Sequence, residues 1–165
     1  MKILGIDPGL NTTGYGVIEG TVGTCGTTLL EGGVVRSVKD AAMAVKIKMI
    51  YDGVHEVIEQ YRPDAVAIES LYSHYDRPTT AIMMGHARGV ICLAAAQFGI
   101  NVFPYAATKV KKMLTGSGHA PKDQMQRAIA IELALKKFPE PADVADALAI
   151  ALCHFHHNKI FTNQR

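Results

Sequence analysis

The chain has 165 residues, of which 48% are hydrophobic, and its 17 Lys and Arg against 15 Asp and Glu give a net charge of +2. That hydrophobic share is enough for one packed domain and argues against a disordered chain. The low net charge excludes binding of a polyanion through overall charge, so a nucleic-acid partner would need a local basic patch.

The cellular compartment is indicated by what the sequence lacks. Its three cysteines are far apart and form no CxxC pair, which favours neither disulfides nor zinc. The N-terminus has no basic segment followed by a signal-peptide core, and the most apolar run, residues 89–100, has only 12 residues. That length is typical of a core helix and too short for a bilayer span. We therefore expect a soluble cytoplasmic protein with no membrane partner.

Three strands are predicted at the start of the chain, over residues 2–7, 12–19 and 27–35. Short loops join them, so they should form an antiparallel meander. The sequence SVKD at 37–40 is a variant of the capping box that precedes a helix. Apolar residues then recur at steps of three and four through residues 43–61, which predicts an amphipathic helix.

Strands and helices alternate in the rest of the chain. We expect strands over 65–69 and 101–105, and helices over 79–98, 108–114, 122–137 and 142 to about 156. Pro121 and Pro141 could each occupy the first turn of the helix that follows. The order predicts an α/β protein with a five-stranded mixed sheet, in which the later strands are parallel and helices cover both faces. Residues 1–158 should be one domain, and 159–165 a mobile tail.

Four carboxylates could meet beyond the strand ends. Asp7 and Glu69 each end an apolar strand, and ligands of open α/β sheets gather at such ends. Asp143 and Asp146 are three residues apart and share a face near the start of the last helix. Two unit charges 4 Å apart repel by roughly 4 kcal/mol at an effective dielectric near 20, and a divalent cation would remove that repulsion. Oxygen ligands suit Mg²⁺ or Mn²⁺, and two such ions could cleave a phosphodiester.

Each carboxylate also has a structural interpretation, which the residues alone leave open. Asp7 could be a turn residue before Pro8-Gly9, and Glu69 a strand-end charge facing water. Asp143 and Asp146 could complement the dipole of a helix N-terminus. The coincidence of all four favours a shared task.

Short motifs follow one another along the chain: GIDPG, TGYGV, AIE at 67–69, GHARGV at 85–90, TKVKK at 108–112, GSGHAPK at 116–122 and DVADALAIALCH at 143–154. In this order they resemble the RuvC family of Holliday-junction resolvases. The resemblance implies a ribonuclease H-like fold, a homodimer, and Mg²⁺-dependent symmetric nicking of a four-way DNA junction. It also implies two Mg²⁺ per active site, replaceable by Mn²⁺, and a branch-migration partner of the RuvAB type.

The resemblance also implies roles for individual residues. By motif position, the catalytic, metal-binding carboxylates would be Asp7, Glu69, Asp143 and Asp146. Some family members have histidine at the position of Asp143. Tyr72 lies where the family has an aromatic residue, often Phe.

Residues that could contact DNA lie in two segments. The segment 108–122 carries lysines around a Gly/Ser loop, a composition that suits phosphate contacts; its candidates are Lys109, Lys111, Lys112, Lys122 and His119. For Lys109 and Lys112 a solvated helix surface is an equal alternative. The segment after Glu69 should overhang the metal site and could stack on or clamp an opened base through Tyr72, His74, Tyr75 and Arg77.

The helix from Thr79 contains Gly85 and Gly89, and each glycine weakens a helix by about 1 kcal/mol relative to alanine. A two-fold contact between copies would offset this cost and give two active sites facing opposed strands. Packing against the chain's own sheet is the alternative. His154, His156 and His157 near the C-terminus are interpreted as ordinary helix-end residues and not as a metal site.

Three other functions fit parts of the sequence. An ATPase of the actin and Hsp70 type also opens on a strand-end acid, but it needs a duplicated domain and a second phosphate loop. Another nuclease of this fold, hybrid-directed or transposase-like, would carry the same carboxylates. A non-catalytic junction-binding module would not need the complete acid set.

Overall fold

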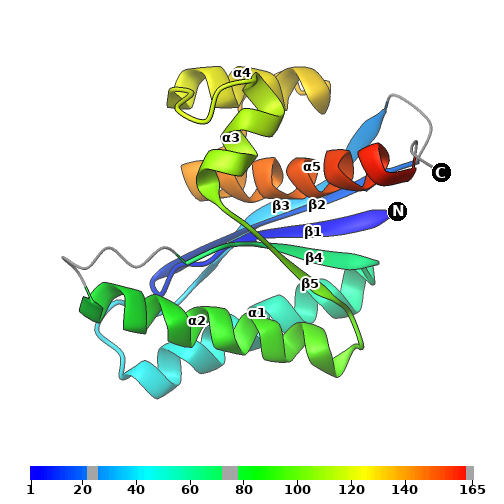
Figure 1. Cartoon of the computed structure of the whole chain (residues 1–165). Coiled ribbons are helices and arrows are strands. Elements are labelled where there is room, and N and C mark those ends of the chain that lie inside the picture. The colour runs from blue at the N-terminus through cyan, green and yellow to red at the C-terminus, as the bar shows by residue number, and fades with distance from the viewer. Residues whose placement is uncertain (22–25, 72–77, 163–165) are drawn as a thin grey trace.

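A five-stranded sheet forms the centre of the computed structural model, which describes residues 1–21, 26–71 and 78–162. The strand order is β3-β2-β1-β4-β5 (Figure 1). The strands are β1 (Lys2–Asp7), β2 (Thr12–Gly20), β3 (Thr27–Arg36), β4 (Ala65–Glu69) and β5 (Val102–Tyr105). The first three pair antiparallel, whereas β4 runs parallel to both β1 and β5. The predicted mixed sheet is therefore confirmed.

Helices cover both faces of this sheet, as predicted (Figure 1). On one face lies α5 (Ala142–Thr162), with α3 (Ala107–Thr115) and α4 (Lys122–Glu132) beyond it. On the other face lie α1 (Met43–Tyr61) and α2 (Pro78–Gln97). The packing of α5 on β1 matters most for function, because it brings the start of this helix to the ends of the central strands.

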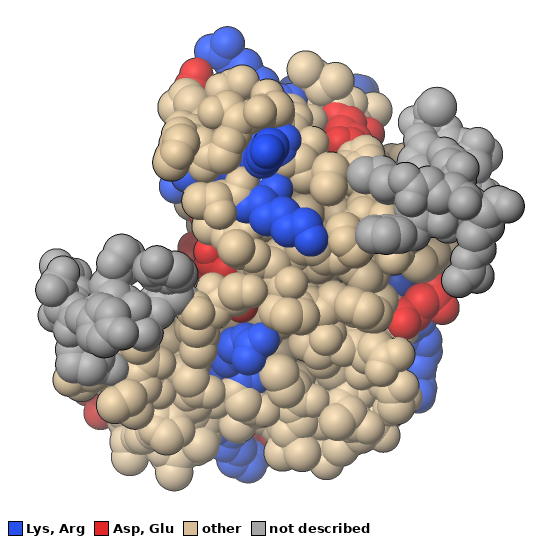
Figure 2. Space-filling model, in the orientation of Figure 1, with Lys and Arg blue, Asp and Glu red and all other residues tan. Residues whose placement is uncertain are grey.

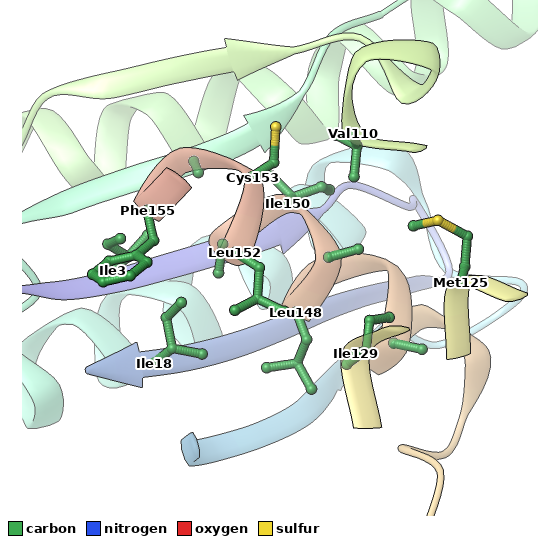
Figure 3. Close-up of a cluster of buried hydrophobic side chains, with 14 of the residues drawn as sticks. Ile3, Ile18, Val110, Met125, Ile129, Leu148, Ile150, Leu152, Cys153 and Phe155 are labelled. Carbon is green, nitrogen blue, oxygen red and sulfur yellow. The ribbon is translucent and has the colours of Figure 1, made fainter. Parts of the chain in front are cut away.

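The core consists of two apolar clusters, one on each side of the sheet. Figure 3 shows the α5 side, where Leu148, Leu152 and Phe155 lie beside Ile3 and Ile18 of the strands. All five are nearly or fully buried. Full burial of a Leu, Ile or Phe side chain contributes about 1.5–3 kcal/mol, so this cluster fixes α5 firmly on the sheet.

Gly14 of β2 allows the start of α5 to approach the sheet. It pairs with Asp7 in the β1-β2 register, and a Cβ built on it would lie 2.1 Å from the carbonyl oxygen of Asp143. No real side chain tolerates that distance, so only glycine fits. The TGYGV motif thus contributes a backbone surface on which the acidic turn of α5 rests.

Several predicted helix boundaries were wrong. The SVKD segment does not cap α1, which begins at Met43 after Ala42 with no side-chain cap. The hydroxyl of Ser37 instead donates to the carbonyl of Leu10 at 2.6 Å. The helix expected over 122–137 ends at Glu132, because the chain turns through a left-handed Ala134 with φ 50° and Leu135 packs against the core.

The last helix differs in length from the prediction, whereas α2 agrees with the predicted helix over 79–98 to within one residue at each end. The last helix continues to Thr162 and not only to about His156, so the expected domain boundary after residue 158 falls within α5. Helix α2 spans 20 residues, longer than the 12-residue apolar run found in the sequence. Within the described residues it is the one helix long and apolar enough to cross a membrane, by length and composition only. Core helices of soluble proteins pass the same test, so this is weak evidence.

Candidate active site

A pocket of about 300 Å³ opens where the C-terminal ends of β1 and β4 face α3, α4 and α5. Its polar lining consists of Asp7, Glu69, Asp146, Lys111 and Lys122. Its apolar wall comes from Ala107, Val110, Met125, Ala149 and Ile150. The strand-end acids predicted to share a crevice do share one, together with one acid of the helix pair and two of the predicted lysines.

Asp7 and Glu69 are brought together by the parallel pairing of β1 and β4. The register places Ile6 opposite Ile68, so the two acids follow as neighbours at the same edge. Burial raises the pKa of Asp7 from the ordinary 3.8 to about 8, and the charges of Glu69 and Asp146 add to the rise. A hydrogen bond between the Asp7 and Glu69 carboxyl groups raises it further, with Asp7 holding the proton. Burial also raises the pKa of Glu69, although the bond to Asp7 and the charge of Lys111 oppose that rise.

The N-terminal part of α5 adds the other two acids, with Asp143 in its first turn. Asp146 lines the pocket, and burial raises its pKa while Lys122 and Lys111 lower it. Asp143 does not line the pocket, but its charge raises the pKa of both Asp7 and Asp146. All four predicted carboxylates therefore interact electrostatically around one opening.

Lysines balance part of this negative charge. Lys111 of α3 lowers the pKa of both Glu69 and Asp146, and Lys122 at the start of α4 lowers that of Asp146. Figure 2 shows Lys and Arg side chains over α3 and α4, in the upper part of the view. The chain thus carries local positive charge beside the acids, as a polyanionic partner would need.

The donor set fits a hard divalent cation in its chemistry. It contains oxygen ligands only, and the raised pKa values reflect like charges and burial that a bound cation would relieve. Within the described residues, however, no three or more His, Cys, Asp or Glu side chains are grouped closely enough to hold an ion as they stand.

The other predicted DNA-binding residues lie away from the pocket or outside the described residues. Lys109 lies over the ring of Tyr105, with its Nζ 5.1 Å from the ring centroid, and does not line the pocket. His119 is exposed in the loop before α4. The predictions for the segment after Glu69 concern residues that the structure does not describe, namely Tyr72, His74, Tyr75 and Arg77.

The outer surface of α2 has the features expected of an interface. Gly85 and Gly89 have open space where a Cβ would be, with no atom within 4 Å. Large apolar side chains nearby are exposed, with Ile82 at 63% and Leu93 at 52%. The glycines therefore do not serve close packing against the chain's own sheet.

The C-terminal histidines make contacts within the chain. His154 is buried, where its Nδ1 hydrogen-bonds the hydroxyl of Tyr105 at 2.8 Å and its Nε2 lies 3.0 Å from the Asn158 amide nitrogen. The Nε2 of His156 contacts the carboxylate of Glu132 in α4. Both side chains therefore have partners within the chain.

Sequence reasoning missed two parts of the site. The apolar wall of the pocket was not predicted, since nothing in the sequence shows which face of α3 or α4 turns toward the acids. Lys46 of α1 was also missed, although it is buried and its ammonium reaches the loop after Asp7. Its position one turn before Ile50, on the buried face of α1, was the available signal.

The sheet order, the helices on both faces and the strand-end acids define a protein of the ribonuclease H-like fold class. The family model for "Crossover junction endodeoxyribonuclease RuvC" matches residues 3–154. The chain therefore belongs to the RuvC family of crossover junction endodeoxyribonucleases.

Individual relatives agree with this family assignment. A crossover junction endodeoxyribonuclease RuvC from Rhodopirellula baltica is 54% identical over 153 residues, covering 92% of this chain and 84% of the relative. One from Pelotomaculum thermopropionicum is 41% identical over 158 residues, covering 95% and 94%. The structure of T. thermophilus RuvC in complex with Holliday junction substrate matches with a TM-score of 0.91 at 35% identity, covering 98% of this chain and 97% of that chain.

Proposed function

We propose that this chain is a structure-specific endonuclease that resolves four-way DNA junctions by paired, symmetric nicks, in homologous recombination and DNA repair. The observation that carries the proposal is the pocket, where acids from β1, β4 and α5 face lysines from α3 and α4. Family membership supports the substrate class, because a RuvC of similar structure binds Holliday junction substrate.

The four carboxylates would hold the metal in this reaction. Asp7, Glu69, Asp143 and Asp146 supply the oxygen donors that Mg²⁺ prefers, and Mn²⁺ could replace it. Two Mg²⁺ ions, when bound, would supply Lewis-acid stabilisation of the phosphate and lower the pKa of the attacking water. Partial burial of Asp7 and Glu69 would reduce the hydration of their oxygens, and the ends of two strands would set their direction.

The lysines would act on the DNA backbone. Lys111 and Lys122 lie in the pocket lining opposite the acids, where their charge can stabilise the phosphate as it gains charge in the transition state. Lys109 and His119 would contact phosphates outside the pocket, without reading sequence. Tyr72 and Arg77 remain predicted contacts of an opened base at the crossover.

A homodimer would place two such sites on opposed strands. The exposed apolar side chains and open glycines of α2 support a contact between copies through this helix. A solution mass of two chains at micromolar concentration, reduced to one chain by Leu93→Lys, would support this assembly. A single-chain mass for the wild type would contradict it.

The cellular setting follows from the reaction. A junction resolvase acts where the chromosome is, so we infer a cytoplasmic protein in a bacterium, without a membrane partner. A branch-migration complex of the RuvAB type would bring junctions to it.

A cleavage panel tests the substrate class. The wild type, with Mg²⁺, is incubated separately with a labelled four-way junction, a linear duplex of the same sequence and an RNA–DNA hybrid. We expect cutting of the junction at a rate well above that of the other two. Preferential cutting of the hybrid would instead make the chain a hybrid-directed nuclease, and junction binding without cutting would make it a recognition module.

A further inference from the structure

The turn that follows Asp7 is held by hydrogen bonds at three of its four residues, Gly9, Leu10 and Asn11. The amide and the carbonyl of Gly9 both bond the hydroxyl of Thr13, at 3.3 and 2.7 Å. The carbonyl of Leu10 accepts from the Ser37 hydroxyl, and that of Asn11 from the Ser37 amide at 3.1 Å. A loop of this kind would be free to move if only its ends were paired, so these bonds fix the direction in which the chain leaves Asp7.

Helix α1 supplies the last of these ties through Lys46. Its Nζ donates to the Asn11 side-chain oxygen at 2.7 Å and also to the carbonyl of Lys39. One ammonium thus joins the loop after β1 to the segment that connects β3 with α1. The first of these segments directly follows Asp7.

This lysine occupies a position that an apolar residue would normally fill. It is 8% exposed and lies one turn before Ile50, on the face of α1 that also buries Val54 and Ile58. None of the salt bridges among the described residues includes it, and the two bonded acceptors are neutral. Burying an ammonium among neutral acceptors is unfavourable compared with an apolar side chain. Packing of the buried face of α1 alone therefore does not explain why a lysine is present.

We propose that Lys46 is a positioning residue for the cleavage reaction, which holds the loop after Asp7 so that the Asp7 carboxylate keeps its direction. This inference rests on the proposed function of Asp7. Lys46 does not line the pocket, so it acts through the loop and not on the DNA or the metal. A displacement of about 1 Å at a catalytic group can cost on the order of a hundredfold in rate, which is enough to make such a tie important.

The test compares Lys46→Met with Lys48→Met. Lys48 is on the same helix, but its side chain is 73% exposed and pairs with Asp52, so the second variant controls for the lost charge. We expect Lys46→Met to keep a wild-type melting temperature or exceed it, and to bind the junction within about threefold of wild type. Its single-turnover cleavage rate should fall by about tenfold or more. Lys48→Met should match the wild type in all three, and Lys46→Arg should recover part of the rate.

Hydrogen exchange of the metal-free protein tests the loop without any activity. In Lys46→Met, the amides of Gly9 and Ser37 should exchange about tenfold faster or more, with no change in the strands. Asn11→Ala, which removes only the acceptor, should speed exchange of the same amides. The double variant of Asn11→Ala and Lys46→Met should exchange no faster than Lys46→Met alone.

The outcomes separate the two proposals. Unchanged exchange and unchanged cleavage in Lys46→Met would overturn the positioning role. The positioning role would also be overturned if cleavage rate, junction binding and melting temperature all fell together, both in Lys46→Met and in Asn11→Ala. A wild type that cuts no junction, with the exchange result as expected, would overturn the proposed function and leave the loop restraint established.

Discussion

Replacing Asp7 by Asn should stabilise the metal-free protein. The rise in the pKa of Asp7 from 3.8 to about 8 means that the native protein binds a proton that the unfolded chain releases above pH 4. The free energy of unfolding therefore decreases as the pH rises from 4 to 8. The rise corresponds to about 6 kcal/mol at pH 8, which solvent screening and relaxation of the site reduce to about 2–3 kcal/mol. Asparagine has a similar shape and does not ionise, so Asp7→Asn should gain this amount.

Thermal unfolding in EDTA between pH 4 and pH 8 measures this effect. For a chain of this size, 2–3 kcal/mol corresponds to a rise in melting temperature of roughly 5–10 °C at pH 8, with little difference at pH 4. Addition of Mg²⁺ should stabilise the wild type and not Asp7→Asn, because a ligand that binds only the native state raises its stability. Asp123→Asn, an exposed acid near Arg127, should change little. A lower melting temperature for Asp7→Asn at pH 8 in EDTA would refute the reasoning.

Three further predictions concern the support of the site. Gly14→Ala should lower the free energy of unfolding by at least about 1–3 kcal/mol and remove most of the cleavage activity, because the new Cβ would lie 2.1 Å from the Asp143 carbonyl oxygen. An unchanged melting temperature and unchanged activity would contradict this. Burial and the nearby His157 lower the pKa of His154 from 6.5 to about 4, so the unfolded chain takes up a proton below pH 6.5 that the native chain does not. Denaturant unfolding should therefore show about 2 kcal/mol less stability at pH 4 than at pH 6.5, a loss that His154→Gln lacks. Lys122→Ala should lower the cleavage rate by about a hundredfold at a saturating concentration of junction. Lys112 is exposed and outside the pocket, so Lys112→Ala should cleave at nearly the wild-type rate. Equal effects of the two substitutions would show that a lysine's position in the pocket is unimportant.

The sheet could be predicted from the sequence because its signals are local. Apolar runs such as Ile3 to Ile6, with a turn after each, define strands, and the alternation with helices sets their direction. Acids at the ends of two such runs then had to share an edge once the strands were parallel neighbours. The carboxylate site followed from that topology together with the i,i+3 pair on the last helix.

What could not be predicted depends on contacts between distant segments. The sequence predicts Ser37 as a helix cap, but its hydroxyl donates to the carbonyl of Leu10. That carbonyl is near only because β2 and β3 are paired. The end of α4 depends on Leu135 reaching the core, which no local propensity indicates. Lys109 and Lys111 lie two residues apart in one motif, yet the rotation of α3 places Lys109 over Tyr105 and Lys111 in the pocket.

The most direct measurement of the central claim is strand-specific cleavage of a four-way junction by the wild type and by Asp7→Asn, with Mg²⁺ and each of the four strands labelled in turn. The account predicts nicks at symmetric positions on two opposed strands with the wild type, and junction binding without nicks with Asp7→Asn. Since that variant should be at least as stable as the wild type, unfolding would not explain the loss. Nicks by Asp7→Asn at the wild-type rate, or wild-type nicks that ignore the junction, would contradict the account.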